Sequence, residues 1–281
     1  MTVATYFQPR SLAEALGLLD AHGPELLVIA GGTVAMPLIN DGISLPTLAM
    51  GLRWAGLDGL ERVGDELRIG ATTTITRLLE QDELPMLGDA ARRTAGWAVR
   101  NMGTVGGNLF TPPPGGDVAT ALLALDARVV LASSRATRSL PLTEFFTGFM
   151  TTALAPDELV TGLVVPIEAG RTSFVKFGRR HDNTPAVVTV AVHATFDGVR
   201  VRACRIALGS AGPHPIRSHA AEAAVVGRAL DDETIAAAAT AAAETCQPVT
   251  DAVASDWYRR RMVGLFVGRA LRELSGAGRQ A

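Results

Sequence analysis

Apolar positions in the first 40 residues follow helical and strand-like spacing in turn. Ser11 and Glu14 have the spacing of a capping box, and the apolar residues after them recur at helical period, which predicts a first helix. The apolar run 26–30 predicts a buried strand, Gly31-Gly32 a tight turn, and residues 33–40 a second helix. The pattern therefore predicts a strand, a glycine turn and a helix in succession.

Further strand-like and helical segments follow up to residue 165. Strands are expected at 47–50, 61–63, 67–70, 128–132 and 158–165, with a hairpin turn at Gly64-Asp65, and helices at 75–80 after Thr74, at 86–99 and at 118–125.

The pattern changes after a break at 166–170. Three antiparallel strands are expected at 173–178, 187–196 and 199–209, and helices dominate from 220 to 274. We therefore predict two domains, 1–168 and 172–281, the second of which is α+β with a three-stranded antiparallel sheet and a helical bundle.

Composition agrees with two folded domains and excludes several partners. The chain has 281 residues, of which 48% are hydrophobic and 19% charged, enough apolar material for two cores. A formal net charge of -2 offers no general attraction for nucleic acid. No apolar run is long enough to span a membrane and no signal peptide is recognisable, while the two cysteines have no metal-binding spacing. These features predict a cytoplasmic protein.

A long glycine- and proline-rich segment, 101–117, interrupts the α/β pattern, and loops of this length inside a domain usually serve a site. Gly31-Gly32, Gly103 and Gly106-Gly107 would let backbone amides approach an anion such as a pyrophosphate. Neither glycine cluster has the G-x-G-x-x-G or the Walker spacing, which excludes a Rossmann fold and a P-loop. The alternative is that these glycines only make tight turns.

The combined motifs resemble the FAD-binding (medium) subunits of the molybdenum hydroxylase family, of the xanthine dehydrogenase and aerobic carbon monoxide dehydrogenase type. The strings that carry the resemblance span the chain: Ala30-Gly31-Gly32-Thr33, the segment 100–109 with Gly103-Thr104-Val105-Gly106-Gly107-Asn108, Asp117, Lys176-x-Gly178-Arg179-Arg180, Gly209-x-x-Gly212-Pro213 and Tyr258-Arg259-Arg260-x-Met262.

The resemblance implies an α/β FAD-binding domain of the PCMH type, itself in two lobes, followed by the α+β C-terminal domain. It implies an oxidoreductase subunit that receives electrons from 2Fe-2S clusters and passes them to an external acceptor. Two such clusters need about eight thiolates, so the clusters and the molybdopterin would lie on an iron-sulfur small subunit and a molybdopterin large subunit, in a dimer of heterotrimers.

The resemblance also implies the FAD site. The expected FAD-binding residues are Ala30, Gly31, Gly32, Thr33, Val34, Ala35, Thr94, Ala95, Thr104, Val105, Gly106, Gly107, Asn108, Asp117, Val160 and Lys176. No histidine or cysteine occurs between Gly23 and Arg180, so the FAD is expected to be non-covalent. The residues themselves show no catalytic or metal-binding set, as expected if the cofactor performs the electron chemistry.

Two departures from the family pattern stand out. Thr33-Val34 replaces the histidine and serine usual in carbon monoxide dehydrogenases, which counts against carbon monoxide as the substrate. The stretch 181–186 lacks the aromatic residue that lies against the flavin in many relatives. Two rival functions stay open at this point: a stand-alone FAD-dependent oxidoreductase on the same fold, and a flavin-free assembly subunit.

Overall fold

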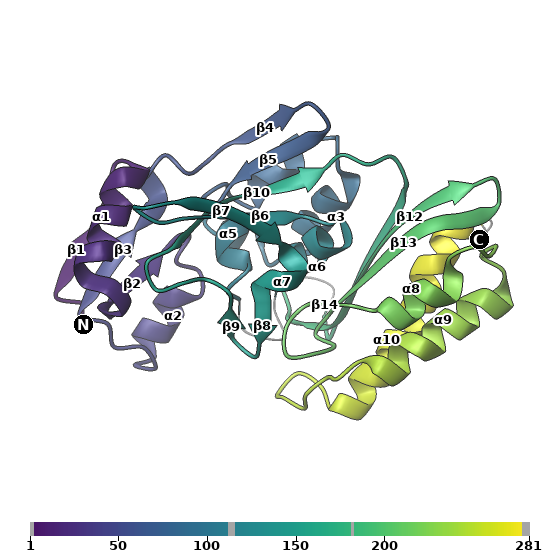
Figure 1. Ribbon diagram of the computed structural model, residues 1–281. Helices are drawn as coiled ribbons and strands as arrows, with labels where there is room; N and C mark the ends of the chain where they lie inside the picture. Colours follow the sequence, from purple (N-terminus) through teal and green to yellow (C-terminus); the bar gives the residue numbers. More distant parts are fainter. Residues whose placement is uncertain (1–2, 112–115, 181–182, 277–281) are drawn as a thin grey trace.

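The computed structural model describes residues 3–111, 116–180 and 183–276. The strands form four separate sheets, arranged along the chain from a small N-terminal lobe through a central lobe to a C-terminal sheet covered by helices (Figure 1).

The N-terminal lobe is a small parallel sheet with two helices. Its strand order is β1 (Thr5–Phe7), β3 (Leu48–Gly51) and β2 (Leu26–Ile29), and its helices are α1 (Leu12–His22) and α2 (Ala35–Asn40). Ser11 caps α1 as predicted, because its Oγ accepts a hydrogen bond from the amide of Glu14 at 3.1 Å. The predicted strand, glycine turn and helix unit is therefore present as β2, the turn at Gly31-Gly32, and α2.

The central lobe is an antiparallel five-stranded sheet with helices packed against it. Its strand order is β4 (Leu60–Val63), β5 (Glu66–Gly70), β10 (Leu159–Pro166), β6 (Arg128–Ala132) and β7 (Thr137–Pro141). The helices are α3 (Pro85–Arg93), α4 (Trp97–Arg100), α5 (Val105–Asn108), α6 (Asp117–Ala124) and α7 (Leu142–Phe145), and a short hairpin joins β8 (Phe146–Gly148) to β9 (Thr151–Thr152).

Two sequence predictions for this lobe are wrong in detail. Residues 76–80 form a 3-10 helix rather than an α-helix. The single helix predicted over 86–99 is divided, because α3 ends at Arg93 and Ala95 takes a left-handed φ of 47° before α4 begins. The sequence reading also missed β7, β8 and β9, which are short or largely exposed.

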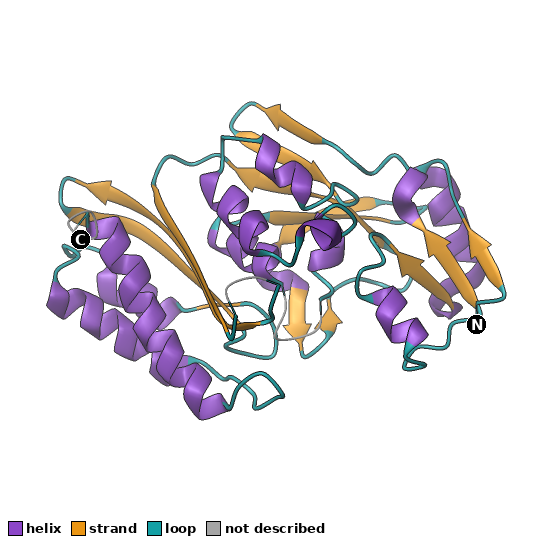
Figure 2. Ribbon diagram, turned by 180° about the vertical axis from the view of Figure 1, so that it is seen from behind, coloured by secondary structure: helices purple, strands orange, loops and turns teal. Residues whose placement is uncertain are grey.

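The C-terminal part has the antiparallel sheet and the helices that the pattern predicts. The strands are β11 (Arg171–Gly178), β12 (Ala186–Asp197), β13 (Arg200–Gly209) and a two-residue fourth strand, β14 (Ile216–Arg217), which the sequence reading missed. Helices α8 (His219–Val225), α9 (Asp232–Thr245) and α10 (Asp256–Ser275) cover one face of this sheet (Figures 1 and 2).

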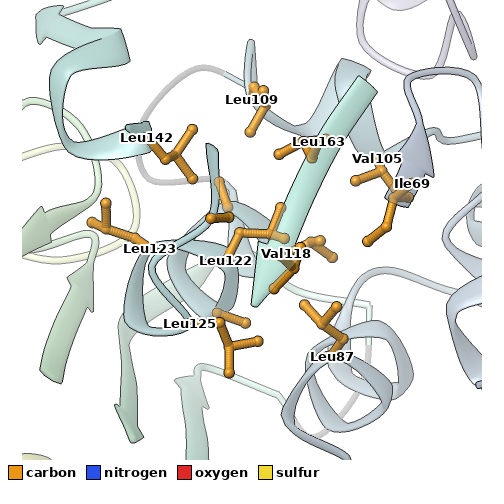
Figure 3. Packing of buried hydrophobic residues seen from close by; sticks show 14 of the residues in the cluster. Ile69, Leu87, Val105, Leu109, Val118, Leu122, Leu123, Leu125, Leu142 and Leu163 are labelled. Atoms are coloured by element: carbon orange, nitrogen blue, oxygen red, sulfur yellow. The ribbon is translucent and has the colours of Figure 1, made fainter. Parts of the chain in front are cut away.

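Helix α6 lies at the centre of the molecule. All eight of its residues are buried, and the surrounding leucines, valines and isoleucines come from α3, α5, α7 and the central sheet (Figure 3). The other side of α6 packs on β12 and β13, whose Ala191 and Ala207 belong to the same core. One helix therefore joins the central lobe to the C-terminal sheet.

Strand β12 is buried on both faces, which explains its nearly continuous apolar sequence. Val188, Val190 and Val192 pack into the core beneath α8 to α10. The alternate residues Thr189 and Ala191 face the central lobe instead.

Arg259 is a buried residue that links several segments of the C-terminal part by hydrogen bonds. Its side chain is 1% exposed and donates hydrogen bonds to the carbonyls of Val187 at 3.0 Å and Ser210 at 3.2 Å and, at 2.8 Å, to both carboxylate oxygens of Asp251. Burial works against ionisation of Asp251, but hydrogen bonds from the amides of Ala254 and Val253 and from Arg259 keep its pKa below the usual range.

Replacing Arg259 with methionine should lower the free energy of unfolding by about 3–5 kcal/mol, since Asp251 and two buried carbonyls lose their partner. Thermal and urea unfolding followed by circular dichroism measures the change. Arg272→Met on the same helix is the control, because Arg272 is half-exposed and lies 3.8 Å from an exposed Asp232. Equal effects of the two substitutions would contradict the prediction.

Candidate cofactor site

A cavity of about 410 Å³ opens between the N-terminal lobe and the central lobe. Its walls come from the end of β2 and the turn after it, from residues 103–111, and from the start of β10. Eleven of the sixteen expected FAD-binding residues line it: Ala30, Gly31, Gly32, Thr33, Val34, Ala35, Thr104, Gly106, Gly107, Asn108 and Val160.

The two glycine clusters, far apart in the sequence, pack directly on each other. A Cβ on Gly31 would overlap the carbonyl oxygen of Met102, so only glycine fits there. A Cβ on Gly103 would lie 3.5 Å from Oγ1 of Thr33, and one on Gly107 would lie 3.9 Å from Cβ of Ala30. Part of the glycine content therefore serves the close approach of two loops, in addition to any contact with a ligand.

The turn after β2 presents backbone donors without partners. The amides of Gly32, Thr33, Val34 and Ala35 donate no hydrogen bond to any residue that the structure describes, although all four residues line the cavity. Gly32 takes a φ of 71°, which turns the chain at this point. Four consecutive unpaired amides in the wall of a cavity fit an anionic group such as a pyrophosphate. We call residues 32–35 the amide loop.

The second glycine cluster, Gly103 and Gly106-Gly107, contributes to the cavity in a different way from the amide loop. Its amides are already used inside the protein, because Val105 donates to Thr73 O, Gly106 to Ala71 O, and Gly107 to Oγ1 of Thr104. Thr104 thereby caps the short helix α5. This segment therefore gives the cavity a wall of small residues, whereas the unpaired donors lie on the amide loop.

The rest of the cavity is mostly apolar, with neutral polar residues such as Ser44, Thr104 and Asn108, and almost free of charge. Leu27, Val28, Leu52 and Leu159 are among its apolar lining residues. Glu158 is the one ionisable residue among the described lining residues, and Arg138 binds it at 2.6 Å and lowers its pKa. None of the described lining residues is a histidine or a cysteine, so the wall offers no side chain of the type that attaches flavin covalently.

Asp117 and Lys176 lie outside this cavity and bind each other. Lys176 Nζ is 2.6 Å from Asp117 Oδ2, with both side chains about one-tenth exposed. The same Nζ donates to Arg93 O at 3.0 Å, and Asp117 Oδ1 accepts from Oγ1 of Thr189 at 2.9 Å. The pair joins α6 to β11 and β12 across the contact between the central lobe and the C-terminal sheet.

Thr94 and Ala95 form the turn between α3 and α4, close to this ion pair and also outside the cavity. Arg100, which the sequence reading missed, donates to the carbonyls of Thr94 at 3.2 Å and Ala95 at 2.8 Å. Since the left-handed conformation of Ala95 has no signal in the sequence, neither the turn nor its arginine could be foreseen. Val105, the remaining expected residue, is fully buried in the core beside α6.

Within the stretch 181–186, which departs from the family pattern, His181 and Asp182 lie outside the described residues. Asn183, which follows them, lies against the turn between α3 and α4, because a Cβ on Gly96 would be 3.7 Å from Cγ of Asn183.

A cavity bordered by unpaired amides and closed by apolar walls is typical of proteins that bind a dinucleotide. Comparison with known families agrees with a dinucleotide-binding site. The model described as the FAD binding domain in molybdopterin dehydrogenase matches residues 2–168, and the CO dehydrogenase flavoprotein C-terminal domain matches residues 173–274.

Individual relatives match over nearly the whole chain. The carbon monoxide dehydrogenase medium chain of Hydrogenophaga pseudoflava is 32% identical, covering 95% of both chains. The glyceraldehyde dehydrogenase medium chain of Sulfolobus acidocaldarius is 29% identical over 96% of this chain and 98% of the relative. A solved structure of the Hydrogenophaga pseudoflava enzyme, which lacks the Mo-pyranopterin moiety of its cofactor, superimposes with a TM-score of 0.93 at 31% identity and covers 98% of each chain.

The chain therefore belongs to the family of FAD-binding subunits of the molybdopterin dehydrogenases. The resemblance drawn from the sequence and the expected fold class are confirmed, and the chain is an oxidoreductase subunit whose cofactor is FAD. Its relatives are medium chains of enzymes with several subunits, which implies partner subunits for this chain as well. No helix in the described ranges is both long and apolar enough to cross a membrane.

A negative charge on the amide loop should weaken FAD binding. Thr33→Glu places a carboxylate beside the expected pyrophosphate, whereas Thr33→Gln has nearly the same shape without the charge. We expect a dissociation constant for FAD at least about tenfold higher for the glutamate than for the glutamine variant, and this ratio should decrease in high salt. Flavin fluorescence titration measures the dissociation constants of both variants. Gly32→Asp is less informative, since any side chain is strained at its φ of 71°.

Lys176, the only lysine of the chain, should be shielded from amine-reactive reagents by its contact with Asp117. Asp117→Asn should raise the rate at which an N-hydroxysuccinimide ester acetylates Lys176 by about tenfold or more, because the buried ammonium loses its counter-charge. Mass spectrometry of peptides gives the rate. Arg92→Lys adds a lysine at a largely exposed position and serves as the fast reference. Wild-type Lys176 reacting as fast as that reference would contradict the pairing.

Proposed function

We propose that this chain binds FAD non-covalently with its pyrophosphate on the amide loop, and that it passes electrons from iron-sulfur clusters on a partner to an external acceptor. The observation that carries the proposal is the set of four unpaired amides, 32–35, in the wall of a mostly apolar cavity. FAD, when bound, supplies the redox chemistry, and the protein binds, orients and shields it.

The remaining expected residues fit distinct roles in this proposal. Ala30 and Val160 would contact the dinucleotide within the cavity, and Thr104 to Asn108 would form the opposite wall. Asp117, Lys176, Thr94 and Ala95 would meet the part of FAD that extends beyond the cavity toward the C-terminal sheet. Lys176 and Asp117 already bind each other there, so contact with the cofactor would add to that pair or replace it.

The partners would be an iron-sulfur small subunit and a molybdopterin large subunit, in a dimer of heterotrimers. Both cysteines of this chain are buried and free, and burial raises the pKa of the Cys204 thiol to about 12. Burial also raises the pKa of the Cys246 thiol. Because iron-sulfur clusters need several thiolates, neither residue is suited to bind one, which supports placing the clusters on another chain. Two free cysteines also suit the cytoplasm that we propose as its location.

A stand-alone oxidoreductase would need groups that act on a substrate. The described wall of the cavity offers one ionisable side chain, Glu158, and Arg138 already binds it. This favours an electron-transfer subunit over a self-sufficient enzyme. The third possibility, a flavin-free assembly subunit, leaves the unpaired amides of residues 32–35 without a use.

The FAD-loaded chain alone should not be reduced by a heterocycle, an aldehyde or carbon monoxide, whereas the co-expressed complex should be reduced by its own substrate. Hydroxylation of such a carbon by water needs a metal centre that this chain is not expected to contain. Anaerobic absorbance of the flavin band, recorded for chain and complex, makes the comparison. Rapid bleaching of the isolated chain by any of these substrates would show it to be an enzyme in its own right.

A further inference from the structure

A second cavity, of about 200 Å³, lies next to the cofactor cavity and is not used by the function proposed above. It is enclosed by the β8–β9 hairpin, by the loop between β13 and β14, and by residues 109–111. Phe110 and Thr111 line both cavities, so a ligand in the second cavity would lie directly beside the FAD site.

The described residues that line this second cavity include the aromatic rings of Phe110, Phe146 and His214. Phe146 stacks on the imidazole of His214, with ring centroids 5.7 Å apart and planes inclined by 16°. Phe145, from behind, packs edge-on against Phe110 at 5.9 Å and Phe146 at 5.4 Å, which holds both rings in place. A cavity this small, with a stacked pair in its wall, suits one planar ring system rather than an extended ligand.

The polar groups of the cavity are neutral hydrogen-bonding groups. None of the described residues that line it is an arginine, lysine, aspartate or glutamate, while Thr111, Thr151 and Thr152 contribute hydroxyls. His214 Nδ1 lies 2.8 Å from Pro215 O and therefore donates to it, which leaves Nε2 for a ligand. The hydroxyls can donate to the carbonyl oxygens of a quinone, and Nε2, which carries a lone pair in this tautomer, can accept from a hydroxyl of the hydroquinone.

We propose that this cavity binds an uncharged quinone ring, the acceptor of the electrons that FAD carries. The inference rests on the proposed function, because it assigns the external acceptor. A nicotinamide dinucleotide is disfavoured, because a cavity of about 200 Å³ is too small for a molecule of that size. One quinone takes two electrons and two protons from reduced FAD and leaves as the hydroquinone, while FAD returns to its oxidised form.

Two neighbouring threonines provide a matched test. Thr151 and Thr147 are both exposed on the β8–β9 hairpin, and their hydroxyls bond each other at 3.2 Å, so either substitution removes the same hydrogen bond. Only Thr151 lines the cavity. An indole at position 151 would fill the space, and one at position 147 would not.

Equilibrium dialysis of 2-methyl-1,4-naphthoquinone against the FAD-loaded chain measures binding directly. We expect saturable binding to the wild type and to Thr147→Trp, and a dissociation constant at least about tenfold higher for Thr151→Trp. His214→Ala, which removes one ring of the stacked pair, should weaken binding several-fold. Reoxidation of the photoreduced flavin by the quinone should slow in Thr151→Trp, and reoxidation by ferricyanide should not.

The FAD content of each variant separates this proposal from the preceding one. If the variants keep the FAD content of the wild type but both tryptophan variants bind the quinone equally well, the quinone site is overturned and the FAD site stands. The same conclusion follows if the wild type binds FAD but shows no saturable quinone binding. Loss of FAD from Thr151→Trp alone would also overturn the quinone site, by assigning the cavity to the cofactor itself. A wild-type chain that binds quinone but no FAD would instead contradict the proposed function.

Discussion

The complete burial of α6 is the constraint on which the rest of the structure depends. This short helix packs against the central lobe on one side and against β12 and β13 on the other, so both parts of the chain share a single core. The close approach requires small residues at the contact, and Ala191 and Ala207 meet that need. Because Asp117 is the first residue of α6, its carboxylate is carried to the C-terminal sheet, where Lys176 and Thr189 bind it.

A second polar contact joins the two parts at the opposite end of α6. Arg205, on β13, donates to Ala124 O at 3.0 Å and binds Glu168 in the connection between the two parts. The hydrogen bond from Arg205 lowers the pKa of Glu168. A carboxylate with a lowered pKa stabilises the fold above its unfolded pKa of about 4.3, and this contribution is lost as the pH falls further. The angle between the central lobe and the C-terminal sheet is thus fixed at both ends of one helix.

Charged side chains are distributed differently between the contacts that join the elements and the two cavities proposed to bind ligands. The ionic contacts at Lys176, Arg205 and Arg259 lie at contacts between elements, and these three cationic side chains are largely shielded from water. The two cavities are lined mainly by apolar side chains, neutral polar side chains and backbone. A neutral surround strengthens the interaction of the unpaired amides with an anion, because no carboxylate at the amide loop competes with it.

The sequence by itself determined the order of most strands and helices, the two-part organisation of the fold and the family, because apolar periodicity and the glycine strings are local properties of the chain. Only the tertiary structure decided how the expected site residues are grouped. It placed eleven of the sixteen around one cavity. It also showed that the amides of Val105 to Gly107 are already bonded while those of residues 32–35 are free. The left-handed Ala95, the arginine that holds its turn, and the pairing of Asp117 with Lys176 each depend on contacts between distant segments. No periodicity or motif encodes such contacts, since they arise only when the core around α6 forms.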